Sequence, residues 1–298
     1  MTKSAPHRMR ATKGGPTVAA ITICRNEERN LPGLFSNLSS CVDQIVIVDD
    51  FSSDRSSEIA AKADANVTFV THAMDPEFGY AGQRNKGIEH AEAEWLIHMD
   101  CDERLSHGLS EEMHAAIKTT KFNAFRYRRL NHFLNRPMRH GGWASWNRPQ
   151  LARKGAHRFE GKLHEAVVVE GGDALIGQLA SQMIHLNEAT FADRLEKSAR
   201  YVTMTAERLE AEGVTATSTS IFARAAREFL KRYVLQSGFR DGTPGLISAM
   251  HSATSEFRAQ ALVWDKQNST SRTALESELA TAWPDCAQVD RQPTDPGR

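Results

Sequence analysis

The chain has 298 residues, of which 40% are hydrophobic, and its 37 basic residues balance its 37 acidic residues. This length suits one large α/β domain with an appendage, or two small domains. A formal net charge of zero gives no general reason to expect nucleic acid or an acidic polymer as the partner.

The N-terminal residues 1–16 are basic, carrying Lys3, Arg8, Arg10 and Lys13 without the apolar segment of a signal peptide. We expect them to form a disordered tail. No run approaches 18 apolar residues, so no transmembrane helix is expected. The cysteines form no CxxC pair, which favours free thiols in a reducing, cytoplasmic compartment.

Short apolar runs alternate with helical patterns through the first hundred residues. The runs that predict buried strands are 18–24, 44–48, 67–70 and 95–99. The patterns that predict helices are 27–39, 58–65 and 80–92. Alternation of this kind predicts an α/β fold with a mostly parallel sheet and right-handed crossovers.

The pattern changes near residue 120. Residues 122–129 alternate with period two, as an antiparallel strand does, and a Gly/Trp/Arg-rich stretch at 140–148 precedes strand-like pieces near 149–153 and 163–170. Helical periodicity then predicts helices at 191–212, 217–237 and 244–266. We therefore expect an α/β domain over 17–188, a helical region over 189–268 and a polar, disordered tail over 269–298.

Acidic residues follow two of the predicted strands. Asp49 ends the second strand, while Asp100 and Asp102 directly follow the fourth. Ligands of such sheets bind at the carboxyl ends of the strands. Carboxylates at i and i+2 of an extended segment point the same way and suit Mg²⁺ or Mn²⁺, which would neutralise a phosphate leaving group. A lone D-x-D is a weak motif, but its place after a buried strand strengthens it.

Four motifs in this order resemble family 2 glycosyltransferases of the GT-A fold. They are Ile23-Cys-Arg-Asn-Glu-Glu28, Val48-Asp-Asp-Phe-Ser-Ser-Asp54, Gly82-Gln-Arg-Asn-Lys-Gly87 and Asp100-Cys-Asp-Glu103. The second half is similar to lipopolysaccharide inner-core β-glucosyltransferases of the WaaE/KdtX type. Its marks are His140-Gly-Gly-Trp143, Arg158-Phe-Glu-Gly-Lys-Leu-His-Glu165, Ile184-His185 and the segment Lys231–Leu246. The likeness covers about 18–266 and places Phe51 where the family usually has glycine.

The resemblance implies a nucleotide-sugar site. It places Cys24, Arg25 and Glu27 at the nucleotide, and Gln83 and Arg84 beside the base and diphosphate. It gives Asp49 a hydrogen bond to the base or ribose, which a carboxylate can accept. A turn or helix-capping aspartate is the alternative for that position.

The same resemblance implies a metal ligand and a catalytic base. Asp102 would hold the metal, and Asp100 would support the ribose or the metal. An inverting transfer needs a general base on the acceptor hydroxyl, and the resemblance places His164-Glu165 there. We prefer Glu165 as the base and keep His164 as the competing candidate; a strand glutamate facing water is the alternative.

Three further side chains are candidates for ligand contact. His185 follows an apolar segment and could be a third metal ligand, because some GT-A enzymes take one from a late histidine; a core or surface histidine is the alternative. Trp143 and Trp146 could stack on the acceptor sugar, but aromatic residues at this density are equally typical of a core.

The segment 221–240 combines apolar and basic side chains, with Glu228 as its one acid. A basic amphipathic helix can lie on an anionic membrane. A helix packed on the domain with a solvated basic face is the alternative. We therefore expect a cytoplasmic protein that could contact the inner face of the cytoplasmic membrane.

Together these features predict an inverting glycosyltransferase. Its donor would be a nucleotide sugar, expected to be a UDP-hexose such as UDP-glucose, and its cofactor Mg²⁺ or Mn²⁺. Its acceptor would be a hydroxyl of a glycan or glycolipid such as the lipopolysaccharide inner core. The alternatives are a nucleotidyltransferase, disfavoured because residues 24–28 lack a glycine-rich phosphate loop, and a non-catalytic nucleotide-sugar-binding protein.

Overall fold

The computed structural model describes residues 15–143, 147–161 and 165–282. These residues divide into two compact units. The residues up to Glu196 together with Phe229–Met250 form the first unit, and Lys197–Glu228 with the residues from His251 onward form the second.

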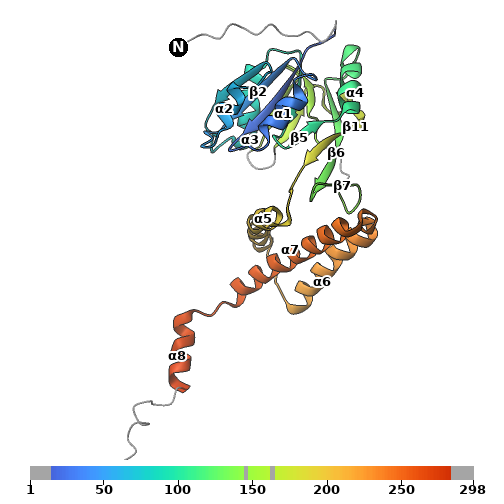
Figure 1. The fold of residues 1–298 in the computed structure, drawn as a ribbon. Coiled ribbons are helices and arrows are strands. Elements are labelled where there is room, and N and C mark those ends of the chain that lie inside the picture. The colour runs from blue at the N-terminus through green and yellow to red at the C-terminus, as the bar shows by residue number, and fades with distance from the viewer. Residues whose placement is uncertain (1–14, 144–146, 162–164, 283–298) are drawn as a thin grey trace, which may run out of the picture. The chain divides into compact units, whose positions relative to one another are not determined.

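The first half of the sheet is parallel, as the sequence predicts. Its order is β3-β2-β1-β4, and each neighbouring pair is parallel. Figure 1 shows this part of the chain in blue to teal, with β2, α1, α2 and α3 labelled. The strands are β1 (Val18–Cys24), β2 (Gln44–Asp49), β3 (Val67–Thr71) and β4 (Trp95–Met99). The connecting helices are α1 (Leu31–Leu38), α2 (Ser56–Ala61) and α3 (Gly79–His90). The α/β class is therefore confirmed.

The second half of the sheet is mixed. Beyond β4 the order continues β8-β6-β11-β5, where β6 and β11 are parallel and the other pairs antiparallel. These strands are β5 (Glu103–Leu105), β6 (Ala124–Phe133), β8 (Leu151–Arg153) and β11 (Ile176–Leu186). A hairpin joins β6 to β7 (Arg136–Met138). Strands β9 (His157–Glu160) and β10 (Ala166–Val169) form a separate antiparallel pair, and a 3₁₀ turn spans Gly172–Leu175.

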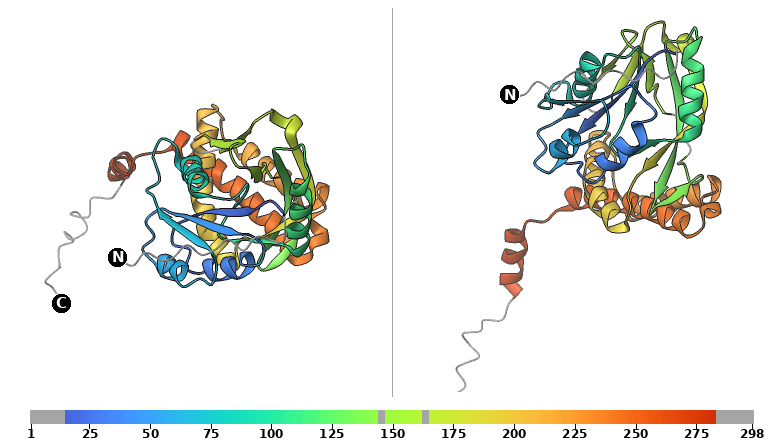
Figure 2. Two further views of the ribbon diagram at one scale, coloured as in Figure 1. Left: turned by 90° about the horizontal axis from the view of Figure 1, so that it is seen from above. Right: turned by 45° about the horizontal axis from the view of Figure 1, so that its top comes forward.

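Alternate residues of the parallel strands point to opposite faces, and helices cover both faces (Figure 2). On one face Ala20, Ile45 and Ile97 pack with the buried residues of α1 and of α4 (His107–Lys118). On the other face Ile21 and Val48 pack beside α3. Burial on both faces explains why these strands are apolar throughout.

Gly87 lets α3 approach the sheet closely. A Cβ atom at this position would lie 2.3 Å from a methyl carbon of Ile21 and 3.3 Å from one of Val48. Any larger residue would push the helix outward. Because Gln83 and Arg84 precede Gly87 by one turn, this close contact sets their height above the sheet.

The second unit is helical. Buried Val202, Ala206 and Leu209 of α5 (Phe191–Ala211) pack with Ala259 and Val263 of α7 (Gly242–Asn268). The helix expected over 217–237 is shorter than predicted: α6 spans Ser218–Leu230, a π-helical segment follows at Lys231–Leu235 and a 3₁₀ turn at Gly238–Asp241.

The segment from 269 onward was expected to be disordered, but Arg272–Ala282 form helix α8. Within this helix Arg272 and Glu276, one helical turn apart, form an exposed ion pair, which adds only a small stabilisation. The rest of that tail, and residues 1–14 of the basic N-terminal segment, lie outside the described residues. Within the described residues, no helix is both long enough and apolar enough to span a membrane.

Candidate functional site

The loops that follow β1 and β2 are joined by polar contacts. Strand register places Cys24 beside Asp49. Arg25 forms an ion pair with Asp50 at 2.7 Å. The amide of Asn26 donates to the Ser52 hydroxyl at 2.8 Å. These contacts hold the carboxyl ends of strands β1 and β2 together at one edge of the sheet.

Asp49 takes the turn role that the sequence left open. One of its carboxylate oxygens accepts from the Ser52 amide at 3.0 Å, and the other accepts from the Ser52 hydroxyl. The residue is buried. Phe51, within this turn, has a φ of 51° and an exposed side chain. Left-handed backbone at a phenylalanine is costly and is held here by the surrounding hydrogen bonds.

Arg84 is the centre of the charged cluster. Its guanidinium donates to Asp100 at 2.7 Å and to Glu165 at 2.8 Å, and its side chain is 3% exposed. The two carboxylates hold its pKa above the usual range against the effect of burial. Its Nη1 atom is buried and has no hydrogen-bond partner among the described residues. One donor group of this buried cation is therefore left unsatisfied among the described residues.

Asp100 is bound by two arginines. Its second oxygen lies 3.1 Å from Arg129, which also forms an ion pair with Glu103. Although burial opposes it, the charges of Arg84 and Arg129 lower the pKa of Asp100. Burial and the neighbouring Asp100 raise the pKa of Glu103 to about 7. Both oxygens of Asp100 are thus committed to arginines.

Asp102 meets His185 from β11. Its carboxylate lies 3.3 Å from Nε2 of His185, and Nδ1 of the same ring contacts the Asn131 side chain at 2.7 Å. One ion with bonds of about 2.1 Å can take two neighbouring ligands about 3 Å apart, so this pair fits a divalent cation. A side-chain partner on the other ring nitrogen is typical of metal-binding histidines.

The pair does not make a complete metal cage. Within the described parts of the chain, no group of three or more His, Cys, Asp or Glu side chains could hold an ion. Mg²⁺ and Mn²⁺ are commonly held by one or two protein ligands together with substrate phosphates and water. The pair therefore fits a metal that binds together with its substrate.

One carboxylate oxygen of Glu165 forms ion pairs with two arginines. Its Oε2 lies 2.8 Å from Arg84 and 2.8 Å from Arg148. Among the described residues, its Oε1 has no hydrogen-bond partner. Both guanidinium groups lie over the ring of Phe159, at 5.6 and 5.8 Å from its centre, and Asn85 of α3 ties the Phe159 backbone to the cluster through two hydrogen bonds. His164 lies outside the described residues.

Three other candidates lie around the same edge. Burial raises the pKa of Glu27, and the charges of Asp102 and Asp100 add to that rise. Gln83 donates to the carbonyl of His72 at 2.7 Å, while its buried oxygen has no partner among the described residues. Cys24 lies against the thiol of Cys101, which raises the pKa of Cys101.

Trp143 is held within the protein. Its indole N–H donates to Ser248 at 3.1 Å, and its ring stacks with that of Phe133 at 6.1 Å between centres. Arg194 lies over both rings. The ring edge is partly exposed. Trp146 lies outside the described residues.

Sequence reasoning missed the roles of Arg129, Asn131 and Arg148. The first two lie on β6, and their side chains position Asp100 and His185. The period-two pattern at 122–129 was a signal for the strand, but nothing in it identified the residues across the sheet.

A buried histidine pair lies beneath Phe159. Nε2 of His157 contacts Nε2 of His98 at 2.8 Å. Nδ1 of His157 must donate to the Arg153 carbonyl at 3.1 Å, so its Nε2 accepts. Burial lowers the pKa of His157. The folded protein therefore keeps this ring neutral.

This pair predicts acid sensitivity. In the unfolded chain His157 has a pKa of about 6.5, whereas in the folded protein its pKa is lower, so the folded protein takes up this proton only at lower pH. Stabilisation by neutral His157 should be complete above about pH 6.5 and should fall as the pH drops below it, by up to about 1.4 kcal/mol per pH unit. Burial also lowers the pKa of His98, which adds a slope of the same sign. Urea unfolding between about pH 7.5 and about pH 5 measures the total slope. His157→Gln should reduce this slope while His98 maintains the rest; an unchanged slope in the variant would contradict the assignment.

Comparison with known proteins identifies the class. Residues 19–168 match the family model described as glycosyl transferase family 2. This match covers half of the chain, so the protein belongs to glycosyl transferase family 2 and is an enzyme of the transferase class. The family expected from the four motifs is thereby confirmed.

The similarity to one relative extends along nearly the whole chain. The lipopolysaccharide core biosynthesis glycosyltransferase LpsC of Rhizobium meliloti (strain 1021) is 25% identical over 268 residues, covering 88% of this chain and 97% of that protein. The uncharacterized glycosyltransferase RC0292 of Rickettsia conorii is 28% identical over 96 residues, or 32% of each chain. The crystal structure of S. aureus TarS 1-349 in complex with UDP has a TM-score of 0.45 and 14% identity, covering 85% of this chain and 92% of that one.

Proposed function

We propose that the protein is an inverting glycosyltransferase that moves a hexose from a nucleotide sugar to a hydroxyl of a glycan or glycolipid. One observation carries the proposal: Arg84 links Asp100, at the donor edge of the sheet, to Glu165 in the second half of the domain. A single buried cation thus connects the group expected to meet the donor with the group expected to meet the acceptor.

The donor would bind across the carboxyl ends of β1, β2 and β4. Glu27, Asp49 and Gln83 lie at this edge and offer acceptors and donors for a base or ribose. The positive charge of buried Arg84 would lie near the diphosphate and attract it. The family resemblance makes a UDP-hexose the proposed donor.

Asp102 and His185 would hold a divalent cation, Mg²⁺ or Mn²⁺. Asp100 is proposed to position Arg84 instead, because both its oxygens already pair with arginines. When bound, such an ion supplies positive charge that stabilises a departing diphosphate. The neighbouring Asn131 would keep His185 in the orientation that presents Nε2.

Glu165 would be the general base. Arg84 and Arg148 fix the carboxylate through Oε2, so Oε1 is the oxygen proposed to take the proton from the acceptor hydroxyl. A carboxylate suffices because the hydroxyl becomes acidic only as its new bond forms. Trp143 would lie on the acceptor side, together with Trp146.

The acceptor class is proposed from the relative. LpsC, whose name assigns it to lipopolysaccharide core biosynthesis, matches nearly the whole of this chain. We therefore favour an acceptor of the lipopolysaccharide inner-core kind.

A panel of UDP-, GDP- and dTDP-sugars tests the proposal. A ligand that binds only the folded state raises the melting temperature, and hydrolysis with and without Mn²⁺ reports turnover. We expect a UDP-hexose to stabilise the protein in the presence of Mn²⁺ and to be slowly hydrolysed. Binding without hydrolysis would favour a non-catalytic binding protein. Formation of a nucleotide sugar from a sugar phosphate and UTP would favour a nucleotidyltransferase.

Peripheral membrane contact is a separate prediction. The large apolar side chains of Leu230, Val234, Leu235 and Phe239 are 50–79% exposed, and basic residues lie between and beside them. Such a surface favours an anionic bilayer. In flotation at low salt we expect the protein to rise with anionic but not with neutral vesicles. Leu235→Ser with Phe239→Ser should abolish this, and a wild-type protein absent from both vesicle fractions would reject the prediction.

A further inference from the structure

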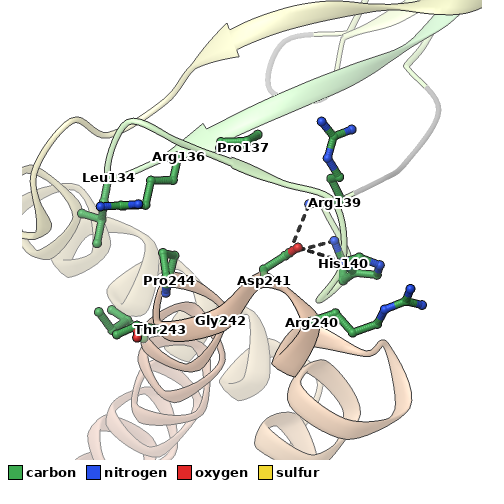
Figure 3. A pocket seen from close by; sticks show the side chains of 11 residues that line it. Leu134, Arg136, Pro137, Arg139, His140, Arg240, Asp241, Gly242, Thr243 and Pro244 are labelled. Atoms are coloured by element: carbon green, nitrogen blue, oxygen red, sulfur yellow. Dashed lines mark hydrogen bonds and ion pairs between the residues drawn. The ribbon is translucent and has the colours of Figure 1, made fainter.

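A pocket of about 740 Å³ lies beside the β6–β7 hairpin, within the first unit (Figure 3). The hairpin turn and β7 form one wall. The 3₁₀ turn that ends at Asp241 and the first residues of α7 form the other. Nothing in the proposed donor site uses this pocket.

Three arginines surround the pocket. Arg136 and Arg139 come from the hairpin side, and Arg240 from the 3₁₀ turn. Figure 3 shows that their side chains extend from the pocket wall in different directions. Among the described residues, none forms an ion pair or hydrogen bond with any of these three guanidinium groups. They are therefore available to an external anion.

The one acid in the pocket wall is already engaged. Asp241 accepts from the amides of Arg139 and His140 at 3.1 and 2.8 Å, and its other oxygen contacts Nδ1 of His140 at 2.8 Å. Its side chain is 5% exposed. The carboxylate thus ties the hairpin to the start of α7 and leaves a positive balance of charge around the pocket.

The start of α7 adds to this positive character. Gly242, Thr243 and Pro244 line the pocket and form the first turn of the helix. The Gly242 amide donates to the Phe239 carbonyl and Pro244 has no N–H, so this end contributes mainly through the helix dipole, which is positive there. Arginine side chains beside the positive end of a helix favour phosphate or carboxylate oxygens.

The pocket adjoins the residue proposed for the acceptor side, because the carbonyl of His140 in its wall accepts from the Trp143 amide at 3.3 Å. It is also linked to the proposed metal pair through the hairpin. In the hairpin Pro137 pairs with His132, and Met138 pairs with Asn131. Asn131 in turn contacts His185. Paired residues of neighbouring strands lie about 5 Å apart, so the pocket wall is on the order of 10 Å from His185.

We infer that this pocket binds a phosphoryl or carboxylate group carried by the sugar acceptor. The assignment to the acceptor rests on the proposed function, whereas anion binding by the pocket does not. The donor diphosphate would lie at Asp102 and His185, and the pocket wall is on the order of 10 Å from His185, so the diphosphate is not the group expected here. A planar arginine can contact such a group through two parallel hydrogen bonds.

Inorganic phosphate is the probe for the first measurement. We expect the full chain to broaden the ³¹P resonance of phosphate, and to do so equally when UDP and Mn²⁺ are present to fill the donor site. Arg136→Gln combined with Arg240→Gln should weaken phosphate binding by roughly tenfold or more, since charged hydrogen bonds are lost. Arg200→Gln removes an exposed arginine of the second unit and is the matched control.

A wild-type protein that does not broaden the resonance would overturn the inference, as would an Arg136/Arg240 variant that broadens it normally. Sedimentation with phosphatidylcholine vesicles, with and without phosphatidic acid, identifies the source when it is done in the Leu235→Ser/Phe239→Ser background, which removes the apolar surface proposed for membrane contact. Arginine-dependent binding to the acidic vesicles supports a lipid headgroup; phosphate binding without vesicle binding supports an anion on a soluble saccharide.

The outcome is separable from that of the proposed function. The double variant should keep wild-type thermal stabilisation by UDP with Mn²⁺, because neither arginine contacts the donor edge. If no nucleotide sugar binds the wild-type protein while phosphate binding still depends on the arginines, the anion pocket stands and the proposed transferase site fails. If nucleotide sugars bind and phosphate does not, the proposed transferase site stands and the anion pocket fails.

Discussion

Asp102→Ala should abolish the dependence of UDP binding on Mn²⁺. In calorimetry the wild-type protein should bind UDP more tightly with Mn²⁺ than without it, and the variant should bind it equally in both cases. Because Asp102 would be one of only two protein ligands, the Mn²⁺-dependent affinity should fall by roughly 100-fold or more. Its side chain is partly exposed and, among the described residues, its one ion pair is with His185, so the fold should persist.

Two controls define this result. His185→Ala should weaken the Mn²⁺ effect as well, because its Nε2 lies 3.3 Å from Asp102. Asp64→Ala removes an exposed carboxylate after α2 and should change nothing. An Asp102→Ala protein that keeps the wild-type response to Mn²⁺ would show that the metal, if one binds, is held elsewhere.

The parallel half of the sheet could be predicted because its strands are buried on both faces. Runs such as 44–48 are apolar throughout, and Asp49 marks where the run ends. Asp49, Asp100 and Asp102 therefore lie at or directly after the carboxyl ends of strands that could be predicted. This is why the sequence could identify the edge of the sheet at which we propose that the donor binds.

The mixed half was harder to predict. Strand β11 contains Gly177, Ser181 and Gln182 among its apolar residues, so it shows no clear run. Helix α4 was missed although its signals were present: Ser106 caps it, and Leu109 and Met113 share its buried face.

The ion pairs that connect the site residues could not be predicted from the sequence. Arg84 and Glu165 are 81 residues apart, yet they share an ion pair that only the folded chain creates. Arg129 looked like one basic residue among several in a strand. Its contacts with Asp100 and Glu103 depend on how β6 lies in the sheet, and pattern alone does not define that order.

Glu165→Gln should lower turnover by roughly 10²–10⁴-fold, the usual contribution of a positioned general base. The amide oxygen can still accept from Arg84 and Arg148, so the side chain should remain in place. Donor and Mn²⁺ binding should be nearly unchanged. The loss should appear in kcat rather than in the donor KM, since proton transfer belongs to the transition state.

His164→Ala is the companion variant, because His164 and Glu165 are adjacent candidates for the same proton. If Glu165 is the base, His164→Ala should cost much less turnover. Steady-state rates with a saturating UDP-hexose and a core oligosaccharide acceptor decide between them. Near wild-type transfer by Glu165→Gln together with an inactive His164→Ala would assign the base to the histidine. Glu165 would then serve to hold Arg84 and Arg148, and its replacement should alter donor affinity instead of kcat.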